Sequence, residues 1–583
     1  MPFFKSPRTI PDKICFGARP SSGRTTITVR VSRVLLVALL AVSGSLFLFS
    51  NSALADDERE VKAASLPPGI PPIPGPKDRE TALLLTQKNE PIFEDILIAP
   101  LASWLKDGKF AMRVVRSLDF PWKLDAGWED SSKRNLLEYR LKDDFSLEYA
   151  GEGTPGAGLP FGTADDINEE SDPVKKAYKI LWNIAYAEAA PRDLYYQIEL
   201  SWVGTQSLLR SATGALYRKF FFAPPAPKLS APKAEAKDPN PAATTAAEVG
   251  EKKPSQEKAE TSPAITFGAP GDVFFETALR IFAPAVVAGF TEFSFRFRGS
   301  DEDQLWLYSP VLKLIRPLLD SNRSDPVLGG NLTFDDFFVT SSKIHSVRAK
   351  VVDQKVILVP VPALTFYRTE AQTFAPQAVT TDAGAKPASG DLPPAKSQEP
   401  KADSAVTVKG FQKKLDGSTT MVLWNYQSRQ LPQLSPWVPT SISFVPHRVW
   451  IIEVFPTDPF YAYGREILIV DQEMMLPVYK LVYDRIGEYR KTVLGGWGLA
   501  RSKDGKTAFP FSAFVMAVDQ SSQTVTAITT QQIQSFQGKD ARSAETVTNW
   551  FDPQKYPGGK PEEKPAEDKK KPAEEQAQGF TND

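Results

Sequence analysis

The sequence predicts an α+β fold, mainly antiparallel β, in which a large sheet is covered on one face by a few amphipathic helices. Short segments with alternating polar and apolar side chains dominate residues 264–369 and 407–552. Helical spacing is clear in only two segments, and long polar stretches interrupt the chain. Because strands alternate with a period of two while helices repeat about every 3.6 residues, these observations indicate a protein built around a sheet.

The clearest strand signal lies in Thr291–Arg298. Phe293, Phe295 and Phe297 occupy alternate positions there, so an extended chain places the three rings on one face and polar side chains on the other. Short gaps between several later segments have the length of hairpin turns. The other predicted strands are Trp306–Tyr308, Lys355–Val359, Arg448–Phe455, Arg465–Asp471, Leu476–Asp484, Glu488–Leu494, Phe511–Asp519 and Gln523–Thr530.

Two helices are predicted to cover the sheet. Asp172 is a suitable N-cap, and Pro173 fits the first helical position because its missing N–H has no partner there. Apolar residues then follow at helical spacing through Ala185. The second helix is expected over Asp272–Val287, bent or ended near Pro284.

The N-terminus predicts export. A basic segment precedes an apolar core, Val34–Phe49, and small residues at Ala53 and Ala55 fit signal peptidase cleavage after Ala55. The alternative is an uncleaved anchor, but this core is short compared with the about 20 apolar residues of a membrane-spanning helix. The only cysteine, Cys15, lies in the predicted signal peptide, so the mature chain has neither disulfides nor thiolate sites. A periplasmic location follows as the prediction.

Composition divides the remaining chain. Residues 223–263, 370–406 and 553–583 are rich in Pro, Ala, Lys and Glu, and are predicted to be disordered linkers and a charged tail. Residues 56–88 form a Pro-rich leader with the signal peptide, 1–55, before it. Residues 89–552 are then predicted as one domain interrupted by the two linkers, with three separate domains as the alternative. A role of the linkers in docking a partner stays open.

Several functions are disfavoured. The net charge is −1 for the whole chain and near −7 without the basic signal segment, so no nucleic-acid partner is expected. His345 and His447 stand apart from any catalytic or metal-binding motif, and neither a metal nor a cofactor is predicted. Acidic pairs occur at Asp165–Asp166 and Asp335–Asp336, but adjacent residues of a strand point to opposite faces, which makes a poor acid–base couple. The protein is predicted not to be an enzyme, with a carboxylate-based hydrolase as the remaining catalytic alternative.

The run Leu305–Phe337 resembles a stretch of a Gram-negative periplasmic family of unknown function, related to outer-membrane lipoprotein-sorting proteins. In these proteins a strand pair is followed by an N-R-x-D loop and an aromatic-x-D-F ending. This chain has Leu314 and Pro317 at two positions where the family pattern has basic residues. The residues that carry the resemblance are Trp306, Tyr308, Pro310, Leu312, Asn322, Arg323, Asp325, Gly329, Phe334, Asp335, Asp336 and Phe337.

Two further regions resemble the same family. Gly158–Phe161 with Lys176–Tyr186 matches one family segment, and Arg448–Trp450 with Asp458–Gly464 matches another. The resemblance implies a LolA-like fold, in which a curved sheet forms an incomplete β-barrel and helices cover the concave face. It also implies a hollow that binds lipidated or other apolar cargo.

Such a hollow requires an apolar lining, because an uncovered sheet face must be filled by helices or by a ligand. We therefore predict a carrier of lipids, lipidated proteins or other apolar molecules, monomeric and without catalysis. An accessory protein that docks on an envelope transporter or outer-membrane protein is the alternative, and ordinary core packing is the alternative for each lining residue. The predicted lining residues are Phe293, Phe295, Phe297, Leu305, Leu307, Trp450, Ile452 and Val454, and the predicted motif-loop residues are Asn322, Arg323, Asp325, Asp335 and Asp336.

Overall fold

The structure is a computed structural model. It describes residues 66–73, 83–117, 122–124, 126–151, 158–189, 193–221, 273–362, 366–369, 422–428, 431–502, 508–536 and 549–557. The predicted signal peptide, 1–55, and the predicted linkers, 223–263 and 370–406, lie outside the described residues. Among the described residues, no helix has the length and apolar character needed to cross a membrane.

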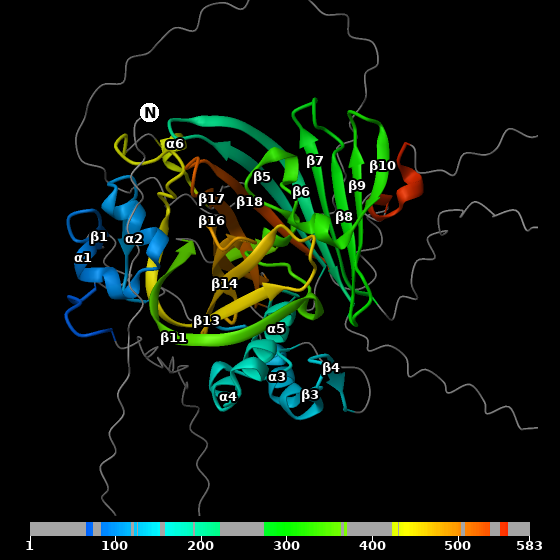
Figure 1. The fold of residues 1–583 in the computed structure, drawn as a ribbon, viewed down its shortest axis with the longest axis horizontal. Helices are drawn as coiled ribbons and strands as arrows, with labels where there is room; N and C mark the ends of the chain where they lie inside the picture. Colours follow the sequence, from blue (N-terminus) through cyan, green and yellow to red (C-terminus); the bar gives the residue numbers. More distant parts are fainter. Residues whose placement is uncertain are drawn as a thin grey trace, which may run out of the picture. The chain divides into compact units, whose positions relative to one another are not determined.

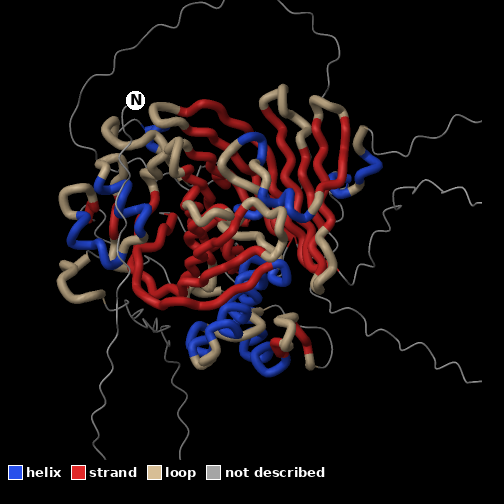
Figure 2. Tube along the Cα trace, viewed as in Figure 1, coloured by secondary structure: helices blue, strands red, loops and turns tan. Residues whose placement is uncertain are grey.

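Strands are the most abundant secondary structure in the described chain (Figures 1 and 2). Every strand predicted from alternation is present, and most are longer than predicted because the pattern weakens toward the strand ends. The strands are β1 Leu83–Leu85, β2 Met112–Val114, β3 Tyr139–Leu141, β4 Leu147–Tyr149, β5 Asp193–Val203, β6 Leu208–Phe220, β7 Val273–Ala283, β8 Thr291–Phe297, β9 Gln304–Ser309, β10 Leu314–Leu318, β11 Val347–Pro362, β12 Phe366–Thr369, β13 Ile442–Pro456, β14 Tyr463–Asp471, β15 Pro477–Asp484, β16 Tyr489–Ser502, β17 Ala508–Asp519 and β18 Val525–Phe536.

Sixteen of these strands form one large, mostly antiparallel sheet within the described residues, and β3 and β4 form a separate hairpin. The order is β1-β2-β13-β14-β15-β16-β17-β18-β5-β6-β7-β8-β9-β10, with β11 on β13 and β12 on β16. Its two ends, β1 and β10, are not paired with each other, so the sheet is not a closed barrel. Strands from all three dense regions of the sequence therefore pair with one another, most directly where β18 pairs with β5 and β6 pairs with β7.

Helices are few. The predicted helix is confirmed as α5, Pro173–Ala189, and its start is fixed by Asp172, whose Oδ1 accepts hydrogen bonds from the N–H groups of Val174 and Lys175 at 2.8 and 3.3 Å. It packs against β11 (Figure 1). The other helices are α1 Glu90–Phe93, α2 Ala99–Lys106, α3 Ala126–Glu138, α4 Ala164–Asn168 and α6 Asn425–Ser428.

The second predicted helix, Asp272–Val287, is wrong. Residues 273–283 form strand β7, which pairs with β6 and β8. Side chains on both faces of β7 are buried, so the strand shows a nearly continuous apolar run instead of alternation. An apolar run of this kind does not distinguish a helix from a doubly buried strand.

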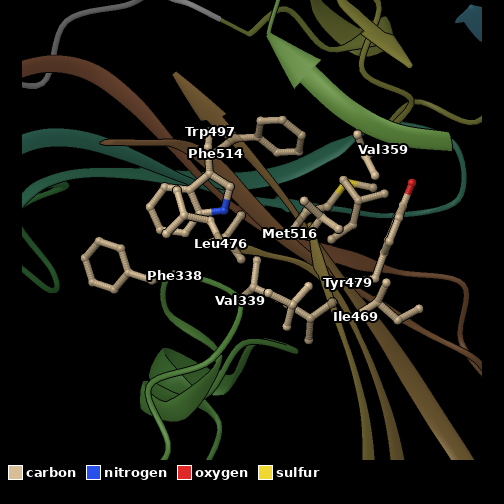
Figure 3. Packing of buried hydrophobic residues seen from close by; sticks show 14 of the residues in the cluster. Phe338, Val339, Val359, Ile469, Leu476, Tyr479, Trp497, Phe514 and Met516 are labelled. Atoms are coloured by element: carbon tan, nitrogen blue, oxygen red, sulfur yellow. The ribbon is translucent and has the colours of Figure 1, made fainter. Parts of the chain in front are cut away.

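The two faces of the sheet are covered differently. We call the face that packs against α2 and α5 the inner face, and the opposite face the outer face. The inner face contributes to the main hydrophobic core, together with α2 and α5. Figure 3 shows part of this core, where Phe338 and Val339 pack among side chains such as Trp497 and Phe514.

The outer face of β6–β9 carries a second, smaller core. It is covered by residues 549–557, which come after β18 in the sequence. Trp550, Phe551 and Tyr556 from this segment are buried against Phe293 and Phe295, with Phe551 lying 5.9 Å from each of the two rings. The first residues of the predicted tail are therefore part of the packed structure.

Candidate functional site

The inner face is covered by one long loop, residues 319–346, which we call the inner loop. At its centre Phe338 and Val339 both have positive φ, 60° and 71°, a costly conformation for residues with bulky side chains. Val339 lies directly over Gly495 of β16, where an added Cβ would come within 2.3 Å of the valine Cγ2 atom. The glycine thus allows the inner loop to approach the sheet closely.

Buried ion pairs hold the inner loop together and attach it to the sheet. Arg323 Nη2 lies 2.6 Å from Asp335 Oδ1 and donates a hydrogen bond to the Ser341 carbonyl oxygen at 3.0 Å. The other carboxylate oxygen of Asp335 accepts a hydrogen bond from the Tyr461 hydroxyl at 2.8 Å. Burial disfavours the charged guanidinium, but the attraction of Asp335 and Asp303 outweighs it, and the pKa of Arg323 is raised.

Asp336 forms the second attachment. Lys480 Nζ lies 2.8 Å from its Oδ1 atom and Lys491 Nζ lies 2.6 Å from its Oδ2 atom. Burial opposes ionisation of Asp336, but the two ammonium groups outweigh it, so the pKa of this carboxyl is well below its usual range. Both motif carboxylates are thus held in buried ion pairs.

A third buried carboxylate, Asp303, is shared by three cations. Its Oδ2 atom lies 2.7 Å from Arg296 Nε and 3.5 Å from Arg323 Nη1, and its Oδ1 atom lies 3.0 Å from Lys343 Nζ. Burial would raise the pKa of Asp303, but Arg296, Arg323 and Lys343 together outweigh it and the pKa is lowered. One carboxylate therefore balances more than one positive charge in this region.

A cleft opens beside this cluster, between α5, the end of the inner loop, and strands β6–β8, β13 and β14. The empty space within it, including the part open to solvent, is about 700 Å³. The apolar walls are Leu181, Trp182, Ile184, Phe274, Phe275 and Val454. Charged residues also line it, among them Glu188, Arg218, Arg296, Lys343 and Glu466.

Arg218 and Glu188 form a buried ion pair in the cleft, with Nη1 2.6 Å from Oε2. The guanidinium also donates to Ser341 Oγ at 3.1 Å and lies 3.9 Å above the ring of Phe338, which connects the cleft to the inner loop. Burial raises the pKa of Glu188 to about 7, against the attraction of Arg218. Burial likewise raises the pKa of Glu466 to about 7, against Lys480.

The predicted lining residues are divided between the two faces. Phe293 and Phe295 belong to the outer core and do not reach the cleft, whereas Phe297 and Val454 line it. Leu305, Trp450 and Ile452 are buried in the inner core, and Leu307 is half-buried.

The motif-loop residues do gather within the inner loop. Arg323, Asp335 and Asp336 hold the buried ion pairs described above. Asn322 accepts a hydrogen bond from the N–H of Leu319 at 2.9 Å and donates one to the carboxylate of the exposed Asp325 at 2.8 Å. These two residues therefore shape the turn that begins the inner loop.

The two histidines have separate surroundings. His345 lines the cleft, and burial lowers the pKa of its imidazole. His447 is buried, with Nδ1 2.6 Å from Asp471 Oδ2. Burial disfavours its charged form, but Asp471 outweighs this effect and the pKa of His447 is raised.

Sequence reasoning missed the charged residues of the cleft. Arg218, Asp303 and Lys343 belong to no motif, and Arg296 appeared only as the polar side of the Thr291–Arg298 alternation. The available signal was the aromatic side of that strand. Because residues 549–557 cover Phe293 and Phe295, the opposite, charged side of the strand faces the interior.

Comparison with known proteins supports the family resemblance. Residues 229–389 match the model of a family described as "Protein of unknown function (DUF1329)", in agreement with the family that the sequence motifs resemble. No curated protein matches the chain.

Solved structures with some similarity include proteins from three bacteria. A putative outer membrane lipoprotein-sorting protein domain from Vibrio parahaemolyticus is 13% identical, with a TM-score of 0.35, over 64% of this chain and 98% of that one. A DUF1329 family protein from Desulfovibrio piger is 12% identical, with a TM-score of 0.35, over 65% and 99%. A LolA superfamily protein from Nitrosomonas europaea is 9% identical, with a TM-score of 0.30, over 63% and 96%.

Proposed function

We propose that the protein is a periplasmic carrier of lipids, lipidated proteins or other apolar molecules. The proposal starts from the match to this family of unknown function. The cleft between α5, the inner loop and strands β6–β8 is the proposed binding site. The observation that carries the proposal is the apolar wall formed by residues such as Trp182, Phe274 and Val454 beside an opening to solvent. The names of the similar proteins, which include a lipoprotein-sorting domain, agree with this role.

The energetics favour an elongated apolar ligand. Each methylene group removed from water contributes about 0.8 kcal/mol. A few buried methylenes offset part of the cost of association, so binding in the micromolar range is expected for a ligand only partly enclosed. The empty space, about 700 Å³ including the part open to solvent, lies in the range of ligand clefts.

Location in the periplasm rests on the N-terminal pattern. The apolar segment Val34–Phe49 followed by Ala53 and Ala55 is typical of a cleaved signal peptide. Protein purified from its native periplasm should begin at Asp56, which N-terminal sequencing would establish. A mature chain that retains residues 34–49 would contradict this part of the proposal.

The carrier function is tested by extraction. Protein purified from its own periplasm without detergent is analysed by native mass spectrometry, and bound lipids are extracted and identified. We expect a co-purifying apolar molecule and displacement of a fluorescent fatty acyl probe. Absence of both would count against a carrier.

A matched pair of variants on α5 locates the site. Ala185 lines the cleft, so Ala185→Trp should fill it and weaken probe binding at least tenfold. Lys175 is exposed near the start of the same helix, so Lys175→Trp should leave binding unchanged. Equal binding by both variants would place the ligand elsewhere.

A docking function is the second candidate, and exposed apolar side chains favour it. Phe460 and Ile486 are 83% and 78% exposed at two neighbouring turns, where Arg485 Nη2 donates to the Asp458 carbonyl oxygen at 3.1 Å. Phe460→Ser should abolish capture of an envelope partner while preserving probe binding. Deletion of 228–260 and 383–401, which lie outside the described residues, tests separately whether the predicted linkers contribute to such docking.

A further inference from the structure

We infer that the inner end of the cleft is a subsite for an anionic headgroup, a carboxylate or a phosphate, and that Arg296 is its principal hydrogen-bond donor. The inference rests on the proposed carrier function, because the apolar walls would hold the remainder of the same ligand. It adds the chemical class of the ligand, an amphipathic anion, which neither the family description nor the similar structures supply.

The first supporting observation is an unused donor. Arg296 is 6% exposed, and its Nε atom donates to Asp303 Oδ2 at 2.7 Å. Its Nη2 atom is buried and has no hydrogen-bond acceptor among the described residues. Buried polar groups in proteins are nearly always paired, so an unpaired guanidinium N–H that lines a cleft points to an external acceptor. Carboxylates and phosphates match the fork geometry of arginine.

The second observation is the local balance of charge. Arg218, Arg296 and Lys343 line the cleft, and they face two carboxylates on adjoining elements, Glu188 and Asp303. Because burial raises the pKa of Glu188 to about 7, its negative charge is incomplete at neutral pH. Asp303 is shared with Arg323 as well. The cleft therefore has a surplus of positive charge in a region of low dielectric constant, where an anion is stabilised strongly.

Glu466, on the opposite wall, does not remove this surplus. Its Oε1 atom is 3.9 Å from Lys480 Nζ and has no hydrogen-bond partner among the described residues. Burial raises the pKa of this carboxyl to about 7, so at neutral pH a large fraction is protonated and can donate a hydrogen bond. His345 also borders the cleft, and burial lowers its pKa, so it is neutral at pH 7. Both groups are compatible with a bound anion.

The lining of the cleft also fits an amphipathic molecule. Arg296 and Lys343 are paired with Asp303 beside the inner loop, whereas Leu181, Trp182 and Ile184 come from α5. We infer that the headgroup lies at Arg296 while the apolar part lies along α5.

The test is a titration of the mature wild-type protein with ligands that share one tail. Decyl phosphate, decanol and decyltrimethylammonium are compared by calorimetry below their micelle concentrations, with inorganic phosphate as the tailless control. We expect decyl phosphate to bind at least tenfold more tightly than decanol, and the cation to bind least. Equal affinities for decyl phosphate and decanol would overturn the subsite but leave the carrier function intact.

Other outcomes separate the two proposals. If none of the decyl compounds binds, the carrier function and the subsite both fail. If inorganic phosphate binds as tightly as decyl phosphate, the anion subsite is supported and the apolar carrier is contradicted.

Variants identify the donor. Arg296→Gln should reduce the tenfold preference for decyl phosphate over decanol to near unity, and Arg296→Lys should retain part of this preference. Arg316→Gln, at an exposed position of β10, is the matched control and should keep the full preference. Retention of the preference in a folded Arg296→Gln protein would overturn the assignment of Arg296. If that variant does not fold, the headgroup comparison on the wild type still decides whether the subsite exists.

Discussion

Asp336 and Lys480 form an ion pair at 2.8 Å between two side chains that are both fully buried, one in the inner loop and the other at the centre of β15. Lys491 Nζ, from β16, lies 2.6 Å from the other carboxylate oxygen of Asp336. The inner loop is thus attached to the sheet by charges that cannot reach water. The stability of this region depends on keeping each charge matched.

Removing the carboxylate should be strongly destabilising. Asp336→Asn leaves two buried lysines without their counter-ion, and breaking a buried ion pair costs about 3–5 kcal/mol. Urea unfolding followed by circular dichroism measures the change in unfolding free energy. Asp325→Asn, at an exposed position of the same loop, should change it by less than about 0.5 kcal/mol. A small effect of Asp336→Asn would mean that the network contributes little.

The unfolding free energy should fall as the pH rises from 4.5 to 7. Burial raises the pKa of Glu188 and of Glu466 from 4.5 to about 7, so the folded state binds these protons more tightly than the unfolded state. Their stabilising contribution is complete below pH 4.5 and is lost as the pH rises through 7. The carboxyls with lowered pKa, Asp303 and Asp336, lose their contribution only below this window.

Glu466→Gln provides the check on this pH dependence. Because glutamine does not titrate, the variant should show a smaller decrease in unfolding free energy between pH 4.5 and 7 than the wild type. Glu488→Gln, at an exposed turn, should follow the wild-type curve. Parallel curves for the wild type and Glu466→Gln would contradict the assignment.

Gly495→Ala should destabilise the inner loop. The added methyl group would meet Val339 Cγ2 at 2.3 Å, and overpacking of this kind costs about 1–3 kcal/mol. Val339→Ala removes the clashing atom, so the double variant should be more stable than the sum of the single effects predicts. Gly299→Ala, with no atom within 4 Å of the new Cβ, is the control. Additive effects in thermal unfolding would show that the two residues are not coupled.

Residues 549–557, which cover the outer core, should be required for stability. Phe551→Ala removes a ring that packs on Phe293 and Phe295, and truncation of a buried phenylalanine costs about 3–5 kcal/mol. Lys555→Ala, exposed in the same segment, should have little effect. Limited proteolysis would report release of residues 549–557 in the first variant only. Resistance of the Phe551→Ala protein to cleavage would contradict the packing.

The strands and α5 could be predicted because their signals are local. Thr291–Arg298 alternates since one side meets the outer core and the other the interior, and Asp172–Pro173 specifies a helix start by itself. β7 was mistaken for a helix because burial on both faces removes the alternation. The sheet topology had no such local signal.

The candidate site was only partly predictable. Arg323, Asp335 and Asp336 were identified through a family motif, but their partners Tyr461 and Lys480 lie more than a hundred residues away. No spacing rule connects positions so distant. The cleft arises only when α5, β8 and the inner loop are brought together, so its charged residues could not be assembled from the sequence.

The pairing of β5 with β18 has a consequence for how the protein acquires its structure. On one side residues 193–203 pair with residues 208–220, which follow directly in the chain, but on the other side their neighbour is residues 525–536, more than 300 residues later. Until that late segment is available, β5 presents an open hydrogen-bonding edge, and closing so long a loop slows folding. During synthesis the sheet therefore cannot be completed at β5 until residues 525–536 have been made. Chains truncated before these residues should aggregate through the open edge of β5.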